Sequence, residues 1–382
     1  MATDVAPSEK LVSIDRVHAA RDVAGELGLD LLVVTPGSDL RYLCGYSAHA
    51  MERLTALVVP ARGEPFLVVP RLEAPMVDAS PAGALGLHVQ AWDETDDAFA
   101  VLAREATSRL GTAPRRIAVG NRTWAEHALG VQRALPGAAL ELAAPVVDRL
   151  RMVKNAAEVE ELAAAGAAID RVHARMASML RVGRSEAEVG ADIAAAILEE
   201  GHVGVDFTIV GSGPNGASPH HDVSARVIEA GDVVVVDIGG ETATGYRSDC
   251  TRTYAVGQEP GPDVAEWYGV LQQAQAAAVA AVRPGVTAEE IDTVARRIIT
   301  DGGYGEHFIH RTGHGIGLDT HEAPYIVEGN DLPLVAGMAF SVEPGIYLPG
   351  RHGARIEDIV VCTEDGVRNL NGGPRELVVL PG

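Results

Sequence analysis

The stretch RTGHGIGLDTHEAP, residues 311–324, holds the residues best suited to chemistry, because two histidines stand among three glycines. Glycine accepts positive φ and lets the backbone approach another group closely. We therefore expect glycines such as Gly313 and Gly315 to present His314 from a tight, irregular backbone. A neutral imidazole in such a place is a natural metal ligand. His321 follows seven residues later, and the segment alone fits a metal site and a glycine-rich turn about equally well.

Four carboxylates recur at matching places in two related halves of the chain. The segment GRSEAEVGADIAAAI aligns with GVTAEEIDTVARRII at an offset of 285 − 183 = 102 residues. Further along, Asp237 aligns with Glu343 (343 − 237 = 106) and Asp249 with Glu357 (357 − 249 = 108). Short loop insertions account for the increase of the offset from 102 to 108 residues. The pattern is typical of an internal repeat, and chance recurrence of helices and strands explains the paired carboxylates poorly.

These carboxylates predict a cation between them. Asp237 ends the run VVVV and Glu343 ends the run MAFSV, so both are expected at the ends of buried strands, where an unpaired charge is costly. Asp249 and Glu357 would lie on the return strands, and a pseudo-twofold axis would bring all four together. Two divalent metal ions, with His314 as a fifth ligand, relieve the repulsion. A ligand set without thiolate favours hard or borderline ions such as Mn²⁺, with Co, Zn or Fe as alternatives.

The elements that must position these residues predict an α/β (α+β) protein. Residues 11–29 have the pattern of a helix, and another helix is expected from Thr123. Apolar runs predict buried strands at residues 29–35, 54–60, 65–70 and 115–120. Capping boxes open helices at Asn155/Glu158, Ser185/Glu188 and Thr287/Glu290. The segment 145–153 leads out of the first part, so we place the domain boundary near Leu150, with domains 1–150 and 151–382.

Composition excludes several kinds of partner. The 382 residues carry a net charge of −22, which repels nucleic acid and anionic membranes. No basic apolar leader and no run of about 18 apolar residues is present, so we expect a cytoplasmic protein without a membrane partner. Cys44, Cys250 and Cys362 are scattered and odd in number, which predicts buried thiols and no disulfide. The acidic run 93–97 is expected to be only a solvated face.

Five motifs resemble one known family. The segments VVVVDIGG, RSDCTRTY, GHGIGLDTHEAP, SVEPGIY and ARIEDIV, in this order, are similar to those of the dinuclear pita-bread metallopeptidases: prolidases, aminopeptidase P and methionine aminopeptidase. The resemblance covers about residues 150–375 and implies a C-terminal pita-bread domain of two related halves. Residues 1–150, with DLRYLCGY, look like the smaller α/β N-terminal domain of prolidases, aminopeptidase P and creatinase, which methionine aminopeptidases generally lack.

The resemblance also implies roles for individual residues. The metal ligands would be Asp237, Asp249, His314, Glu343 and Glu357. Asp249 and Glu357 would bridge the two ions or nearly do so. His220 lies 321 − 220 = 101 residues before His321, and in the family both contact the substrate or the tetrahedral intermediate. His310 matches a position that lines the pocket beyond the scissile bond. Without such support, the remaining histidines His202, His221 and His307 are expected to be structural.

Two departures from the family pattern bear on the site. Asp237 and Asp249 are 12 residues apart where many relatives have 11, and we expect the added residue to fall in the turn between their strands. Several prolidases carry an arginine shortly after the HExP segment that pairs with the dipeptide carboxylate, but Tyr325 stands here. Tyr325 is thus a candidate substrate contact, and strict dipeptide specificity is in doubt. Arg355 is another candidate contact, expected chiefly to be a partner of the ligand carboxylates.

The expected activity is that of an Xaa-Pro dipeptidase or aminopeptidase, a metal-dependent hydrolase of peptide substrates acting as a homodimer. A hydroxide bridging two metals would attack the N-terminal peptide bond, and we expect this bond to precede proline. Glu343 would pass the proton to the leaving nitrogen, while His321 and His220 stabilise the oxyanion. Three alternatives stay open: hydrolysis of a small non-peptide amide, metal-free cleavage like that of creatinase, and a non-catalytic relative.

Overall fold

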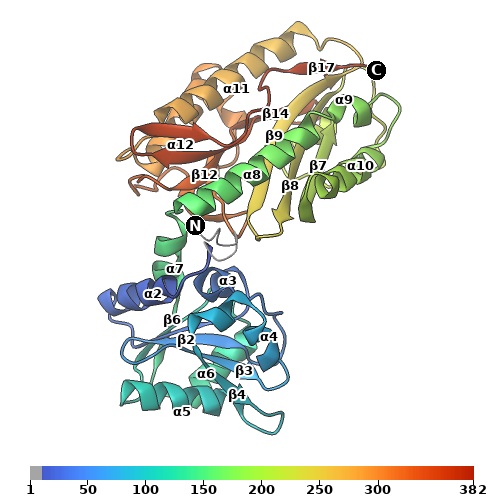
Figure 1. Cartoon of the computed structure of the whole chain (residues 1–382). Helices are drawn as coiled ribbons and strands as arrows, with labels where there is room; N and C mark the ends of the chain where they lie inside the picture. Colours follow the sequence, from blue (N-terminus) through green and yellow to red (C-terminus); the bar gives the residue numbers. More distant parts are fainter. Residues whose placement is uncertain (1–10) are drawn as a thin grey trace, which may run out of the picture. The chain divides into compact units, whose positions relative to one another are not determined.

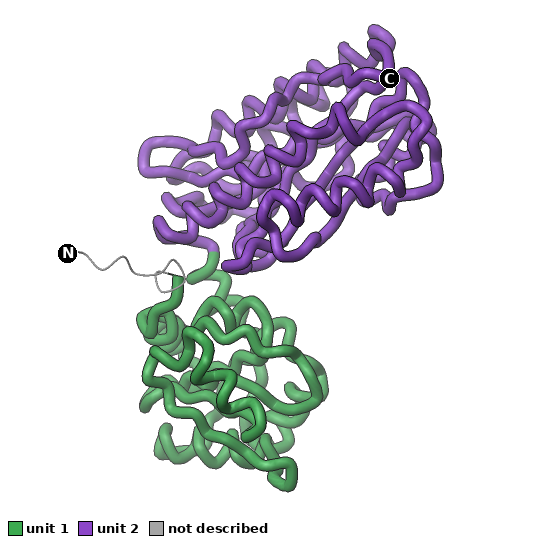
Figure 2. Tube along the Cα trace, turned by 45° about the vertical axis from the view of Figure 1, so that its right-hand side comes forward, with its two compact units in different colours: residues 1–151 green, residues 152–382 purple. Residues whose placement is uncertain are grey.

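A computed structural model describes residues 11–382, which form two compact units. The first unit ends at Arg151 and the second runs from Met152 to Gly382, as the two colours of Figure 2 show. Both units mix helices with sheets, so the predicted α/β fold class is confirmed.

The first unit is built on a six-stranded mixed sheet with the order β4-β3-β2-β1-β5-β6. Every residue of β1, β2 and β3 is buried, because continuous apolar runs form strands that are covered on both faces. The strands are β1 (Leu31–Val34), β2 (Ala56–Pro60), β3 (Phe66–Pro70), β4 (His88–Trp92), β5 (Arg116–Val119) and β6 (Ala139–Leu142). The helices are α2 (Ile14–Glu26), α3 (Ser38–Cys44), α4 (Ala74–Asp78), α5 (Ala98–Leu110), α6 (Ala125–Ala134) and α7 (Ala144–Arg151).

Two helices of this unit differ from the prediction. Helix α2 is shorter than residues 11–29, because Ser13 caps its N-terminus and Gly28 takes positive φ just beyond its end. Helix α7 forms in the segment expected to lead out of the domain, where it buries Val146 and Val147.

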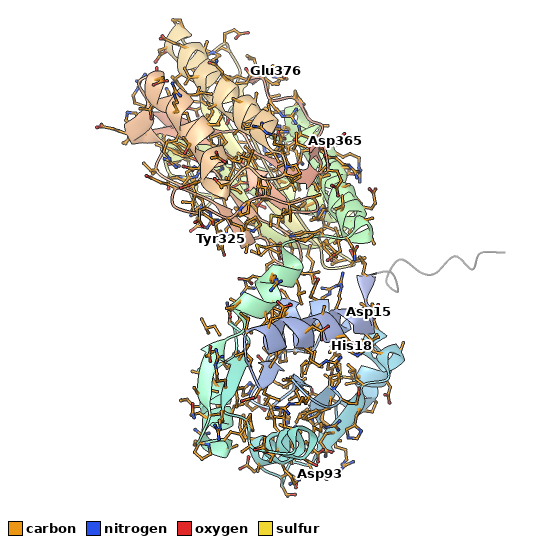
Figure 3. All side chains as sticks on the ribbon, turned by 90° about the vertical axis from the view of Figure 1, so that its left-hand side faces the viewer. Asp15, His18, Asp93, Tyr325, Asp365 and Glu376 are labelled. Atoms are coloured by element: carbon orange, nitrogen blue, oxygen red, sulfur yellow. The ribbon has the colours of Figure 1, made fainter. Side chains whose placement is uncertain are left out.

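The acidic run 93–97 has the solvated character that we predict. Asp93 forms an exposed ion pair with Arg71, and Figure 3 labels it at the edge of the first unit. Asp97 accepts hydrogen bonds from the backbone N–H groups of Phe99 and Ala100, and so caps α5.

The second unit contains two main sheets and a hairpin. One sheet has the order β17-β9-β8-β7 and the other β11-β10-β12-β15-β16, and β13 pairs with β14. The first sheet consists of β7 (His202–Ser212), β8 (Val233–Thr242), β9 (Arg247–Val256) and β17 (Val378–Leu380). The second consists of β10 (Gly313–Gly315), β11 (Glu322–Ile326), β12 (Ala339–Val342), β15 (Asp358–Thr363) and β16 (Gly366–Asn369). The hairpin joins β13 (Gly345–Leu348) to β14 (His352–Arg355).

Helices cover each of these sheets. The helices are α8 (Ala156–His173), α9 (Met176–Met179), α10 (Glu186–Glu199), α11 (Pro262–Ala281) and α12 (Ala288–Asp301). Apolar side chains of α8 and α10 pack with those of β8 and β9 in one core, whereas those of α11 and α12 pack with those of β12 and β15 in another. Figure 1 labels these four helices around the strands β8, β9 and β12. Each core buries the apolar face of one sheet against two helices.

The internal repeat predicted from the sequence is present. All three predicted capping boxes form, at the starts of α8, α10 and α12. The N–H of Gly183 donates to the carbonyl of Ile228, and at the matching place Gly285 donates to Leu334, both at 2.9 Å. The helices α10 and α12 and the strand pairs that follow them therefore occupy equivalent places in two halves.

The glycines around His314 act differently from the prediction. None of Gly313, Gly315 and Gly317 has positive φ, so that part of the prediction is wrong. A Cβ atom on Gly313 would lie 1.9 Å from the carbonyl oxygen of Ser341, and one on Gly315 would lie 2.2 Å from that of Ala323. The glycines are required because the backbones of β10, β11 and β12 pack too closely for any side chain.

Two further expectations concern the cysteines and the membrane. Cys44, Cys250 and Cys362 are all free and buried, as predicted. Within residues 11–382, no helix has both the length and the apolar character needed to span a bilayer.

Candidate active site

A cavity of about 950 Å³ in the second unit brings the predicted residues together. Nine of them line it: His220, Asp237, Asp249, His310, His314, His321, Glu343, Arg355 and Glu357. Tyr325 is not part of the lining, whereas Arg311, which sequence analysis did not select, is.

Neighbouring strands position the carboxylates. Asp249 on β9 lies opposite Gly239 of β8, two residues beyond Asp237, so both side chains project from the same face of the sheet. Glu343 directly follows β12, and Glu357 stands in the short link between β14 and β15. One prediction is corrected: Asp237 lies inside β8 and not at its end, because pairing with β7 continues to Thr242.

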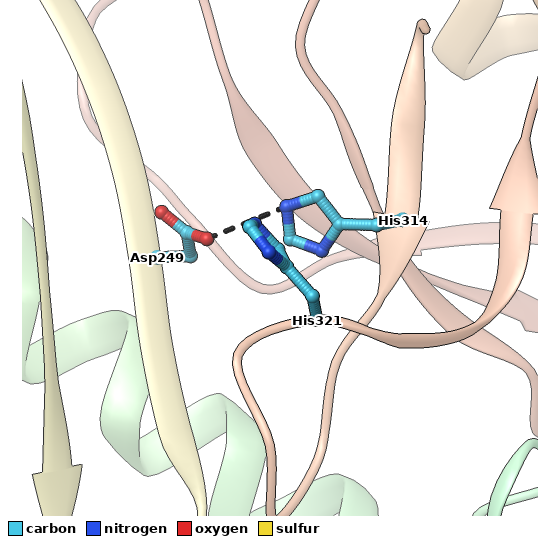
Figure 4. A group of neighbouring side chains, drawn as sticks. All are labelled: Asp249, His314 and His321. Carbon is cyan, nitrogen blue, oxygen red and sulfur yellow. Dashed lines mark ion pairs between the residues drawn. The ribbon is translucent and has the colours of Figure 1, made fainter. Parts of the chain in front are cut away.

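His314 is oriented as a ligand. Its Nδ1 lies 3.1 Å from the carbonyl oxygen of Gly315, to which it donates a hydrogen bond. Its Nε2 then faces Glu343 Oε1 at 3.2 Å and Asp249 Oδ2 at 3.6 Å, the second contact being drawn in Figure 4. A histidine whose second nitrogen is bound by a carbonyl presents a fixed tautomer to a metal.

Three overlapping groups of side chains have donor atoms within 4.8 Å of one another. The groups are Asp237/Asp249/Glu357, His314/Glu343/Glu357 and Asp249/His314/His321. The first two contain all five residues that we predict as ligands. The third adds His321, whose ring lies edge-on to that of His314 with centroids 4.1 Å apart (Figure 4). Donor geometry alone therefore permits His321 as a ligand as well.

The electrostatics of this cluster call for a cation. Burial and the charge of the neighbouring Glu357 raise the pKa of Asp249 well above its usual range, and burial with the charge of Glu343 does the same to the pKa of Glu357. For Glu343, burial acts in the same direction, but the neighbouring His314 and the positive charges of His310 and Arg355 together outweigh it and lower its pKa to about 2. Asp237 Oδ1 is buried without a hydrogen-bond partner among the described residues. Divalent ions would satisfy that oxygen and neutralise the cluster, so the residues present fit a metal centre.

A layer of partners that sequence reasoning missed surrounds the ligands. Thr251, two residues after Asp249 and on the same face of β9, donates to Glu357 at 2.7 Å. The hydroxyl of Tyr347 lies 2.7 Å from Nη1 of Arg355 and 2.9 Å from Nε2 of His310. Both residues lie in the same sequence motifs as predicted ligands. This closeness in the sequence could have identified them as neighbours of the ligands.

Two buried carboxylates hold the segments that carry the histidines. Glu186, at the start of α10, accepts hydrogen bonds from the backbone N–H of Ser212 at 2.8 Å, from that of Ser224 at 3.2 Å and from Nε2 of His221 at 2.8 Å. His221 thus fixes its segment to Glu186 and also lines the cavity, and its structural role stays a prediction. In the other half, Asp292 of α12 accepts from the backbone N–H and the hydroxyl of Thr312, two residues before His314.

The remaining histidines are open to the cavity. His220 and His321 are exposed, whereas His310 is half-buried and held by Tyr347. Loss of hydration and the positive charges of His314 and Arg311 lower the pKa of His321 to about 4. His321 thus lies close to both a predicted ligand and an arginine side chain.

Comparison with known proteins agrees with this geometry. Residues 160–364 match the model of metallopeptidase family M24, and residues 16–153 match the creatinase/prolidase N-terminal domain. The chain is 55% identical over 366 residues to a probable dipeptidase PepE of Mycobacterium bovis, with 96% of each chain covered. It is 36% identical to an Xaa-Pro dipeptidase of Lactobacillus delbrueckii subsp. lactis, covering 93% of this chain and 96% of the relative. The crystal structure of dipeptidase PepE from Mycobacterium ulcerans superposes with a TM-score of 0.92 at 56% identity, covering 96% of this chain and 98% of that one.

Fold and site together define a metallopeptidase of the pita-bread class with a creatinase/prolidase-type N-terminal domain. The chain belongs to metallopeptidase family M24. The family resemblance and the fold expected from the five sequence motifs are thus confirmed.

Proposed function

We propose that the protein hydrolyses the N-terminal peptide bond of Xaa-Pro dipeptides or short peptides, using two divalent metal ions. The five ligands would be Asp237, Asp249, His314, Glu343 and Glu357. The observation that carries the proposal is the convergence of these side chains in one cavity, where an oxygen of Asp237 is buried without a partner. The names of the relatives, which are dipeptidases and Xaa-Pro dipeptidases, support the substrate class.

The metal ions would supply Lewis acidity, lowering the pKa of the attacking water and polarising the scissile carbonyl. Side chains of the protein would transfer the proton and stabilise the charge that develops on the carbonyl oxygen. Glu343, held by His314 and by the hydroxyl of Ser341 at 3.1 Å, would take the proton of the water and deliver it to the leaving nitrogen. His321 and His220, both open to the cavity, would donate hydrogen bonds to the carbonyl oxygen as it gains negative charge.

The proposal is tested by removing and restoring metal. Purified protein treated with a chelator should lose turnover, and Mn²⁺, Co²⁺, Zn²⁺ or Fe²⁺ should restore it to different extents. We expect the highest activity with Mn²⁺, because oxygen ligands dominate the set. Full turnover in protein that elemental analysis shows to be free of metal would contradict the proposal.

The substrate class is tested in parallel. Xaa-Pro dipeptides, Xaa-Pro-Yaa tripeptides, Met-peptides and creatine should be compared with the metal-loaded enzyme. We expect hydrolysis of the Xaa-Pro compounds. Exclusive cleavage of creatine would point to creatinase-like chemistry, and cleavage of none of them would favour a different amide substrate or a non-catalytic role. The homodimer and the cytoplasmic location stay predictions.

A further inference from the structure

The residue directly after His321 is a buried carboxylate with a buried partner. Glu322 begins β11, and its Oε1 lies 2.8 Å from Nζ of Lys154. The side chain of Lys154 is 1% exposed and that of Glu322 is 7% exposed. Neither residue lines the cavity, whereas His321 does, with its ring against that of His314 (Figure 4). The ion pair therefore acts on the cavity only through the backbone that joins Glu322 to His321.

The carboxylate of Glu322 also closes the turn that precedes it, residues 317–322. Its Oε2 accepts a hydrogen bond from the backbone N–H of Asp319 at 3.4 Å. A Cβ atom on Gly317 would lie 2.7 Å from Oε1 of Glu322, so the missing side chain leaves room for the carboxylate. The N–H of Arg247 on β9 donates to the carbonyl of Gly317 at 2.9 Å. The turn is thus folded around one buried carboxylate and attached to the neighbouring strand.

Lys154 reaches this turn from a fixed position. Its N–H donates to the carbonyl of Gly337 at 2.8 Å. Val153 before it forms a β-bridge, and Asn155 after it is the N-cap of α8. Because the backbone is held on both sides, little further conformational entropy is lost when the ammonium group forms its ion pair.

The other half of the repeat contains a matching contact. His220, which aligns with His321, is followed by His221, whose Nε2 lies 2.8 Å from Oε2 of the fully buried Glu186. In each half, the residue after an open cavity histidine is therefore held at 2.8 Å by a buried side chain beside the start of a helix. The residue types differ between the halves, so the arrangement is repeated although the sequence is not.

We propose that Lys154 is a positioning residue for His321, because its ion pair with Glu322 holds the turn that presents the imidazole to the reacting carbonyl. The inference rests on the proposed function. A buried ion pair is seldom needed for stability, since apolar residues of similar size often pack equally well in its place. The pair instead defines one geometry at Glu322. A displacement of about 1 Å at a reacting group can cost about 100-fold in rate.

The test combines Lys154→Met with His321→Ala in a double-mutant cycle. In the metal-loaded protein, Lys154→Met should lower kcat by about 10- to 100-fold, while KM and metal content stay at the wild-type level. In the His321→Ala background, the same substitution should change kcat by less than about twofold, because the imidazole that Lys154 positions is gone. Lys154→Arg, which keeps the charge, should recover part of the loss. Arg151→Met breaks a buried ion pair with Asp39 in the first unit, and as the control it should leave kcat unchanged.

A second variant covers the case in which the single substitution prevents folding. A buried carboxylate without its partner is strongly destabilising, whereas Lys154→Met/Glu322→Gln leaves no unpaired charge. We expect the same loss of kcat and the same dependence on His321. Hydrogen exchange provides a measurement without turnover. The amides of residues 317–322 should exchange about 10-fold faster or more in both variants, while those of residues 213–222 keep their rates.

Three results would overturn the inference. The first is an equal loss of kcat from Lys154→Met with and without His321, which would show a general structural role. The second is a fall in metal content, because the ion pair would then support the ligands. The third is unchanged hydrogen exchange in residues 317–322. Failure of the proposed function looks different, because the wild type would then hydrolyse no Xaa-Pro compound, and the exchange measurement would decide by itself whether Lys154 holds the turn.

Discussion

The guanidinium of Arg355 binds one oxygen of Asp237 at 2.5 Å, while the second oxygen of the same carboxylate is buried and unpartnered among the described residues. Only one oxygen of Asp237 is thus bound by a described residue, and a carboxylate oxygen of Asp237 lies within 4.8 Å of donor atoms of Asp249 and Glu357. Breaking a buried ion pair costs about 3–5 kcal/mol, because the charge that remains is left without a partner.

Arg355→Gln should therefore destabilise the metal-free protein by about 3–5 kcal/mol. Added metal should recover part of this loss, since a cation can replace the missing charge beside Asp237. Chemical denaturation with and without Mn²⁺ measures both effects. The matched control is Arg351→Gln, because Arg351 forms an ion pair with Asp263 in which both side chains are more than half exposed, so the cost should stay below about 1 kcal/mol. Equal effects of the two substitutions would contradict this account.

Asp249→Ala should abolish both metal binding and activity. Asp249 lies in two of the three candidate ligand groups, so no neighbouring carboxylate can replace it in both. Metal content by elemental analysis and kcat with an Xaa-Pro dipeptide are the two measurements. Asp263→Ala, a change at the surface, is the control and should affect neither. A near-wild-type kcat in Asp249→Ala would remove Asp249 from the metal centre.

His321→Ala should lower kcat by about 10²–10³, the usual cost of one oxyanion donor, while the metal content stays at the wild-type level. The edge-on contact with His314 makes the second measurement decisive, because His321 also lies within one candidate ligand group. If metal content falls together with kcat, His321 is a ligand. If neither changes, the residue is structural. His220→Ala, in the matching place of the other half, should behave as His321→Ala does.

Glu186 predicts a specific pH dependence of stability. Burial raises the pKa of Glu186, but the hydrogen bonds from Ser212, Ser224 and His221 outweigh it and lower its pKa from the usual 4.5 to about 2. A carboxyl group whose pKa is lower in the folded than in the unfolded protein stabilises the fold above the unfolded pKa. That contribution, about 3 kcal/mol, should be lost as the pH falls from about 4.5 to about 2.

Glu186→Gln should remove this contribution and flatten the stability profile over the same pH range. It should also lower kcat, since Glu186 holds the segment that carries His220. Denaturation from pH 6 to pH 2 and kcat at pH 7 are the measurements. Glu199→Gln, at the other end of α10 in an exposed pair with Arg175, should alter neither. An unchanged slope in Glu186→Gln would show that the buried carboxylate does not govern acid stability.

The sequence by itself determined the features that depend on short distances along the chain or on the repeat. The three capping boxes were predictable, because a cap joins residues only three positions apart. The four carboxylates that we propose as ligands could be selected because the repeat carries chemically alike residues at nearly constant offsets. The buried strands of the first unit follow from uninterrupted apolar runs.

Only the tertiary structure decided how these residues are supported. Glu186 binds His221, 35 positions away, and Asp292 binds Thr312, 20 positions away, so no local pattern marks either carboxylate as part of the site. The need for glycine at position 313 comes from a strand that begins more than twenty residues later, and not from positive φ.

The tertiary structure also decides which charged side chains of the cavity are neutralised by a partner. Tyr325 was predicted to contact substrate, yet it lies outside the cavity lining and stacks on Arg311. Arg355 is neutralised by Asp237, 118 positions away in the chain, whereas Arg311 is not neutralised by any described residue. Ion pairing and steric exclusion depend on separations of a few ångströms in space, and the order of residues in one sequence does not specify which distant side chains reach that separation.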